Sequence, residues 1–148
     1  MKRHVALEPF SRDHYSGLTL AKALVTGEPL AAERCRAEWE KELKDHFEQE
    51  ERLLGGLVPS ELSEQLAGEH REIADLISLL PENGPRLGQV LNDHIRWEER
   101  VLFPWIESNC TSNQLAALFA QTTIVEESRW KLNPMRKEQV ERRNHGSR

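Results

Sequence analysis

A histidine and a glutamate four residues apart occur twice where a buried helix normally carries apolar residues. The pairs are His46 with Glu50 and His94 with Glu98. Because residues four apart lie one turn apart on the same face of a helix, each pair can direct a nitrogen and a carboxylate oxygen to one point. Buried groups of this kind constrain the fold strongly, since something in the folded chain must compensate them.

Apolar residues around each pair recur every three or four positions, as on the buried face of a helix. Two more stretches have the same spacing, and each contains one histidine at a core position. Each of the four expected helices therefore directs a histidine toward the core. The stripes run through Phe10, His14, Gly17 or Leu18, Ala21 and Val25; through Trp39, Leu43, His46, Glu50 and Leu53; through Leu62, Leu66, His70, Ile73, Ile77 and Leu80; and through Leu87, Leu91, His94, Glu98, Val101 and Trp105.

Six polar groups on apolar stripes need compensation, because burying an imidazole or an ionised carboxylate without a partner is costly. For any single residue, a His–Glu hydrogen bond inside the core is an adequate explanation. For all six together, a shared metal site is the better interpretation, since imidazole nitrogens and carboxylate oxygens are common metal ligands. The candidate ligands are His14, His46, Glu50, His70, His94 and Glu98.

Glycine and proline residues divide the chain into helices and turns. We expect helices at about 11–26, 30–54, 60–80 and 85–108, with a kink near Pro104, and a shorter fifth helix at about 113–127. The short connections favour antiparallel neighbours. The predicted fold class is all-α: an antiparallel up-down four-helix bundle with an N-terminal arm at residues 1–10 and a short fifth C-terminal helix.

The length of 148 residues suits one domain. We expect residues 1–128 to form the helical bundle and residues 129–148 to form a basic tail. The formal net charge is −5, and the part before the tail is the acidic part, which disfavours nucleic-acid binding. The tail could dock on its own acidic bundle, contact a partner or stay disordered.

The two cysteines are expected to stay unpaired. Cys35 lies near the start of the second expected helix and Cys110 follows the fourth, which places them toward opposite ends of the bundle. Two free thiols are typical of a reducing compartment. No apolar run is long enough to cross a bilayer, and the first residues lack a signal-peptide core. We therefore expect a cytoplasmic protein without a membrane segment.

The ordered set of motifs around the candidate ligands resembles the hemerythrin-like, or HHE cation-binding, domains. The resemblance covers nearly the whole expected bundle. It is carried by Arg12-Asp13-His14, by Asp45-His46-Phe47-Glu48-Gln49-Glu50-Glu51, by Gly68-Glu69-His70, and by His94-Ile95-Arg96-Trp97-Glu98-Glu99-Arg100-Val101-Leu102-Phe103-Pro104.

This resemblance implies a non-haem di-iron centre with an oxide or hydroxide bridge, although zinc or manganese is an alternative. His14 and His46 would bind one iron, His70 and His94 the other, and Glu50 and Glu98 would bridge them. The oxygen carriers of the family have a second histidine one turn after the position of His70, where this chain has Ala74. A coordination position is therefore expected to be open.

The leading functional expectation is a protein that binds dioxygen, nitric oxide or peroxide as a sensor, store or scavenger. The alternatives are a di-metal enzyme that reduces a small oxidant or performs hydrolysis, and an interaction module in which the metal is structural. The sequence assigns no catalytic residue, and it does not identify a protein partner.

A few residues near the stripes have weaker claims. Tyr15 and Glu69 are each adjacent in sequence to a candidate ligand but point about 100° away around the helix, so we expect them on the surface, with a hydrogen bond to a ligand as the alternative. His4 and His145 are expected to be solvated. Trp130 is a candidate anchor for the tail.

Overall fold

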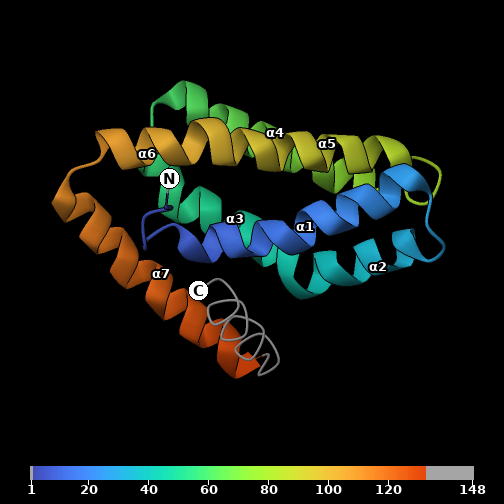
Figure 1. Ribbon diagram of the computed structural model, residues 1–148, viewed down its shortest axis with the longest axis horizontal. Helices are drawn as coiled ribbons and strands as arrows, with labels where there is room; N and C mark the ends of the chain where they lie inside the picture. Colours follow the sequence, from blue (N-terminus) through green and yellow to red (C-terminus); the bar gives the residue numbers. More distant parts are fainter. Residues whose placement is uncertain (1, 133–148) are drawn as a thin grey trace.

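Helices make up nearly all of the structure, a computed structural model that describes residues 2–132 (Figure 1). No β-strand occurs within these residues, so the predicted all-helical fold class is confirmed. The elements in chain order are α1 (Glu8–Thr26), α2 (Ala31–Glu38), the π-helical turn η1 (Trp39–Leu43), α3 (Lys44–Leu54), the 3₁₀ turn η2 (Gly55–Leu57), α4 (Ser60–Ser78), α5 (Gly84–Trp97), the π-helical turn η3 (Glu98–Leu102), α6 (Phe103–Asn109) and α7 (Ser112–Leu132).

Two of the helical rods are continuous through a π-helical turn. The turn η1 joins α2 to α3, and η3 joins α5 to α6, so the expected helices at 30–54 and 85–108 are each one rod. Pro104 lies in the first turn of α6, directly after η3, close to the predicted kink. In space, α1 lies along α5, α4 contacts both α3 and α5, and α7 runs obliquely back against α3 (Figure 1).

The first helix begins at Glu8, earlier than the expected start near residue 11. Pro9 lies in its first turn, where a missing backbone N–H leaves no bond unmade. Ala6 and Leu7 are fully buried and Phe10 is nearly so. The segment before the helix is therefore shorter than the predicted arm, and its last residues enter the core instead of running along the outside.

A layer of polar side chains separates two apolar clusters in the core. Along α1, along α4 and along each of the two rods that contain α3 and α5, a buried histidine lies between residues of one cluster and residues of the other. The first cluster includes Leu20, Leu24, Phe47, Ile73, Leu87 and Leu91. The second includes Leu7, Phe10, Leu53, Leu66, Leu102 and Phe103. The candidate ligands thus occupy one level of the helices, enclosed above and below by hydrocarbon.

Two glycines allow α1 and α5 to approach closely. A β-carbon at Gly88 would lie 2.5 Å from the carbonyl oxygen of Ala21 and 2.8 Å from a methyl carbon of Val25. A β-carbon at Gly17 would lie 2.7 Å from the Cδ1 atom of Ile95. Because neither glycine carries a side chain, the backbone of α1 approaches α5 closely at Gly88, Ile95 packs directly on Gly17, and His14 reaches Glu98 on the neighbouring rod.

The structure also bears on the cysteines and on membrane-spanning segments. Cys35 is buried, Cys110 is partly buried, and both are free thiols. Between residues 2 and 132, no helix has the length and apolar character that crossing a membrane would require.

Candidate metal centre

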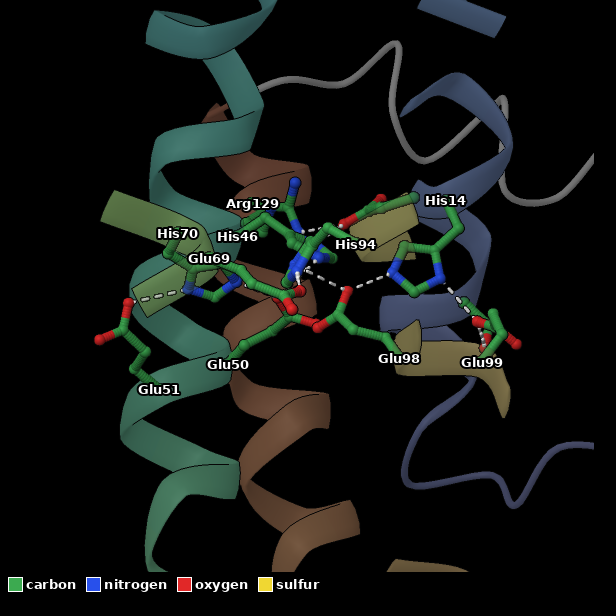
Figure 2. Close-up of polar contacts among 12 residues, drawn as sticks. His14, His46, Glu50, Glu51, Glu69, His70, His94, Glu98, Glu99 and Arg129 are labelled. Carbon is green, nitrogen blue, oxygen red and sulfur yellow. Dashed lines mark hydrogen bonds and ion pairs between the residues drawn. The ribbon is translucent and has the colours of Figure 1, made fainter. Parts of the chain in front are cut away.

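The structure brings the six predicted ligands together in the polar layer (Figure 2). They form two groups that share Glu50 and Glu98, and within each group the potential ligand atoms all lie within 4.8 Å of one another. One group adds His14 and His46, and the other adds His70 and His94. All six side chains are buried. The arrangement therefore offers two neighbouring places for a cation, each with two imidazoles and two carboxylates.

Each histidine uses its Nδ1 atom to contact a carboxylate on the outside of the cluster. The Nδ1–oxygen distances are 2.6 Å for His14 with Glu99, 2.8 Å for His46 with Asp13, 2.8 Å for His70 with Glu51 and 2.7 Å for His94 with Glu69. If the Nδ1 atoms donate their protons to these carboxylates, every Nε2 atom keeps a lone pair for the interior. A carboxylate behind a histidine is the usual way in which proteins orient a metal-binding imidazole.

These outer carboxylates follow a regular rule along the chain. Each one is adjacent in sequence to one ligand but serves a different histidine on another helix. Asp13 precedes His14 and contacts His46, and Glu99 follows Glu98 and contacts His14. By the same rule, Glu51 and Glu69 serve His70 and His94.

The sequence contained a usable signal for these partners, namely an acidic residue directly beside a ligand. The pattern of apolar stripes does not identify Asp13, Glu51 or Glu99, because none of them lies on a stripe. Glu69 adopts the alternative given for it, a hydrogen bond to a ligand, with 27% of its side chain exposed. Tyr15 is 68% exposed, as expected. His4 is half-buried, and its Nδ1 atom accepts a hydrogen bond from the backbone N–H of Ala6.

Two adjacent glutamates of the turn η3 contact one imidazole. His14 lies with Nε2 2.9 Å from an oxygen of Glu98 and with Nδ1 2.6 Å from an oxygen of Glu99. In a regular α-helix adjacent side chains diverge by about 100°. Glu98 and Glu99 are the first two residues of η3, and π-helical turns occur frequently at functional sites.

Five interior atoms of the cluster are left without hydrogen bonds. Both oxygens of Glu50, one oxygen of Glu98, and the Nε2 atoms of His70 and His94 have no hydrogen-bond partner. The Nε2 atom of His70 is 3.2 Å from an oxygen of Glu50, but not in hydrogen-bond geometry. Buried polar atoms without partners are costly. Their convergence on one region fits the donor set of a transition-metal pair.

The charges in the cluster are strongly coupled. Burial alone would lower the pKa of His14, but its hydrogen bonds to Glu98 and Glu99 outweigh burial and raise the pKa to about 9. Burial opposes the charge of His46 as well, but the nearby Glu50 raises its pKa to about 10. Without a metal, protons on these imidazoles would supply the positive charge that balances the buried carboxylates.

The two shared carboxylates differ from each other. Burial raises the pKa of Glu98, and the charge of Glu50 raises it further. For Glu50 burial acts in the same direction, but His46 outweighs it, so the pKa lies well below its usual range. Two carboxylates held this close repel each other unless a cation lies nearby.

Aromatic rings enclose the imidazoles. Phe47 stacks on His70, with ring centroids 3.9 Å apart and planes 5° from parallel. Phe103 stacks in the same way on His14, at 5.5 Å and 6°. Phe10 meets His46 edge-on at 5.6 Å. These contacts limit rotation of the rings and keep the surroundings of the donor atoms apolar.

Two arginines from opposite ends of the described chain hold outer carboxylates. Arg3 contacts an oxygen of Glu99 at 2.9 Å, and Arg129 in α7 contacts Asp13 at 3.0 Å. The start of the predicted basic tail therefore docks on the acidic side of the helices, one of the three alternatives. The helix α7 continues across residue 128, and Trp130 donates a hydrogen bond to Glu126 within it. The rest of the predicted tail, including His145, lies outside the described residues.

Comparison with known proteins yields no relative: no protein-family model, no curated protein and no solved structure matches the chain. The proposed function is supported instead by the residues of the polar layer and their surroundings.

Proposed function

We propose that this chain is a hemerythrin-like di-iron protein that binds dioxygen, nitric oxide or peroxide. The observation that carries the proposal is the set of buried carboxylate oxygens and imidazole nitrogens that converge without hydrogen-bond partners. A core that leaves five such atoms unpaired is costly unless cations lie among them.

The arrangement of the helices supports the antiparallel four-helix bundle. Along α1 and α4 the chain passes from the second apolar cluster, through the polar layer, to the first. Along α3 and α5 it passes in the opposite sense. Helices that contact each other, such as α1 with α5 and α4 with α3, therefore cross the layer in opposite directions. Helix α7 would be an addition to this bundle.

Each cation would take two imidazoles and share the carboxylates. His14 and His46 would hold one iron, His70 and His94 the other, and Glu50 and Glu98 would bridge them. Imidazole suits iron, and two anionic bridges offset the charge of two close cations. Ala74, one turn after His70, offers no further donor, so each cation would have two imidazoles and two shared carboxylates and would keep a position open for a small ligand.

When bound, a di-iron pair supplies redox chemistry and a position at which a small ligand can coordinate. The chain's own residues orient the donors and limit access. The outer carboxylates fix which nitrogen of each imidazole faces inward. The stacked Phe47 and Phe103 make the walls apolar, which suits small uncharged ligands such as dioxygen and nitric oxide.

The direct test is metal analysis followed by exposure to the gases. Protein purified from its own cells should contain two irons per chain. Iron loaded anaerobically should give a charge-transfer absorption band that changes when dioxygen or nitric oxide is added. Binding in fixed stoichiometry without turnover would mark a sensor or store, whereas catalytic consumption of peroxide or nitric oxide would mark the enzymatic alternative.

A pair of variants makes this test specific. The double variant His46→Ala with His94→Ala removes one ligand from each group and should bind no iron firmly. His4→Ala removes a half-buried imidazole outside the cluster and should behave like the unmodified protein. An iron-loaded protein whose absorption spectrum does not change on addition of dioxygen, nitric oxide or peroxide would overturn the proposal.

A further inference from the structure

The two halves of the cluster differ in what holds their outer carboxylates. Behind His14, Glu99 contacts both the hydroxyl of Ser11 and the guanidinium of Arg3. Behind His46, Asp13 is held by Arg129, and only 13% of the Asp13 side chain is exposed. Each of these imidazoles is therefore supported by a carboxylate that is itself fixed by an arginine.

The other half has no comparable support. Among the described residues, the Glu51 carboxylate forms a hydrogen bond or ion pair with His70 alone, and 43% of the Glu51 side chain is exposed. Glu69 contacts His94 and the side-chain amide of Gln65. Within residues 2–132, neither glutamate forms an ion pair with an arginine or a lysine. These carboxylates can exchange their histidine contacts for water more easily than Asp13 and Glu99 can.

The positive charge of Arg3 and Arg129 does not offset the benefit of firmer support for His14 and His46. Each arginine also binds a further carboxylate: Arg3 contacts Glu107 at 2.6 Å, and Arg129 contacts Glu42. The added cations are therefore matched by added anions on the same side of the cluster. The halves differ mainly in how firmly the imidazoles are oriented, and loss of such orienting contacts typically weakens metal binding 10–100-fold.

We propose that the two cation positions are unequal, with the position at His14 and His46 the tighter one because Arg3 and Arg129 act as positioning residues for it. This inference rests on the proposed function only in requiring that the polar layer binds two cations. Under this proposal, Asp13 on α1 and Arg129 on α7, the first and last helices of residues 2–132, both contribute to holding the cation at His14 and His46.

Zinc and imidazole nitrogen NMR can observe the order of filling. Zn²⁺ is added stepwise to metal-free, ¹⁵N-labelled protein, and long-range ¹H–¹⁵N spectra follow the Nε2 atom of each histidine. We expect His14 and His46 to shift during the first equivalent and His70 and His94 during the second. Removing one equivalent from the fully loaded protein with a chelator should release His70 and His94 first.

Variants identify the cause of the order. Arg129→Gln should weaken the first step about tenfold and bring the two steps together. Arg129→Lys, which keeps the charge near Asp13 but loses the planar fork, should have a smaller effect. Arg86→Gln is the matched control, because Arg86 pairs with Glu72 on an exposed surface and should change neither step. Helical circular dichroism of each variant verifies folding.

The outcomes separate this inference from the proposed function. Simultaneous shifts of all four histidines, or earlier filling at His70 and His94, would overturn the unequal positions and leave the di-metal proposal standing. An unchanged order and affinity in folded Arg129→Gln would overturn the positioning role of Arg129. No zinc-dependent shift at any histidine would overturn both proposals.

Discussion

At the scale of single residues, each histidine of the site lies between two carboxylates. The outer one takes Nδ1 and the inner one faces Nε2, as for His14 between Glu99 and Glu98. A histidine in this position can carry a proton when no metal is present and can offer a lone pair when one is. The same residues therefore serve two charge states of the core.

Removing the charge of Glu50 tests whether the inner carboxylates hold the cations. Glu50→Gln keeps the shape of the side chain but supplies one neutral amide where both unpaired oxygens stood. We expect the metal-loaded protein to bind its cations at least tenfold more weakly and to lose most of the stability that metal confers. Thermal unfolding with and without metal measures this. If metal raised the melting temperature of Glu50→Gln and of the unmodified protein equally, Glu50 would not be a ligand shared by the two cations.

The raised pKa values of His14 and His46 predict how pH affects the metal-free protein. The ordinary histidine pKa is 6.5, and the folded values are about 9 and about 10. The folded state therefore keeps protons that the unfolded state releases, so their stabilisation is complete below pH 6.5 and is lost as the pH rises through 9 to 10.

The melting temperature of metal-free protein should therefore fall by several degrees between pH 6.5 and 10. Bound metal replaces these protons, so the melting temperature of the metal-loaded protein should fall less between pH 6.5 and 10. Differential scanning calorimetry at constant ionic strength makes the comparison. A metal-free melting temperature that rises across this interval would show that the imidazoles are not protonated in the folded core.

Spacing alone was enough to predict which six residues meet. Apolar stripes mark the face that must be buried, and a histidine or glutamate on a stripe has to enter the core with it. The outer partners were harder to predict because they point about 100° away from the ligand beside them. Asp13 is useful to His46 only because folding brings Asp13 of α1 within 2.8 Å of His46 of α3, and the sequence spacing of either helix does not contain that fact.

At the scale of helices, the close approach of α1 and α5 is the feature that places His14 beside Glu98. Gly88→Ala would put a methyl group 2.5 Å from the carbonyl oxygen of Ala21. The backbone must shift to accommodate it, at a cost of about 1–3 kcal/mol in the free energy of unfolding. Metal affinity should fall as well, because His14 moves with α1.

The control for this prediction lies in α4. A β-carbon at Gly68 would meet only the end of the Arg71 side chain, at 3.9 Å. Gly68→Ala should therefore be neutral or stabilise the protein by up to about 1 kcal/mol through helix propensity. Urea unfolding of both variants gives the comparison. A Gly88→Ala variant as stable as Gly68→Ala would mean that α1 and α5 do not depend on this contact.

Helix boundaries were predicted to within three residues except at the end of α7, which runs to Leu132 and is not the short helix expected at 113–127. The internal irregularities of the helices were not predicted. Glycine and proline mark the turns before Ala31, Ser60 and Gly84 clearly. The turns η1 and η3 contain no such marker at their first residues, Trp39 and Glu98. The extra residue of a π-helical turn moves the buried face on by one position. Val101, expected on the buried stripe of the fourth helix, is therefore 44% exposed, whereas Leu102 and Phe103 are buried in its place.

At the scale of the whole molecule, removing the metal should weaken one level of the core and leave the two apolar clusters in place. We expect backbone amides of Glu50 and Glu98 and their neighbours to exchange with solvent much faster in metal-free protein. Amides around Leu24 in the first cluster and Leu54 in the second should change less. Hydrogen exchange measured by mass spectrometry tests this. Uniform acceleration along the chain would instead indicate one cooperative unit.

Because the donor layer lies between two separate hydrocarbon regions, the protein can be re-engineered from either end. Residues around Leu24, Cys35 and Leu80 could be redesigned for a higher melting point without touching an imidazole, since they belong to the first cluster alone. Three aromatic rings contact the imidazoles: Phe47 of the first cluster lies on His70, and Phe10 and Phe103 of the second contact His46 and His14. Changes at these rings would instead alter the reactivity of the metals, so thermostability can be adjusted independently of reactivity at positions away from them.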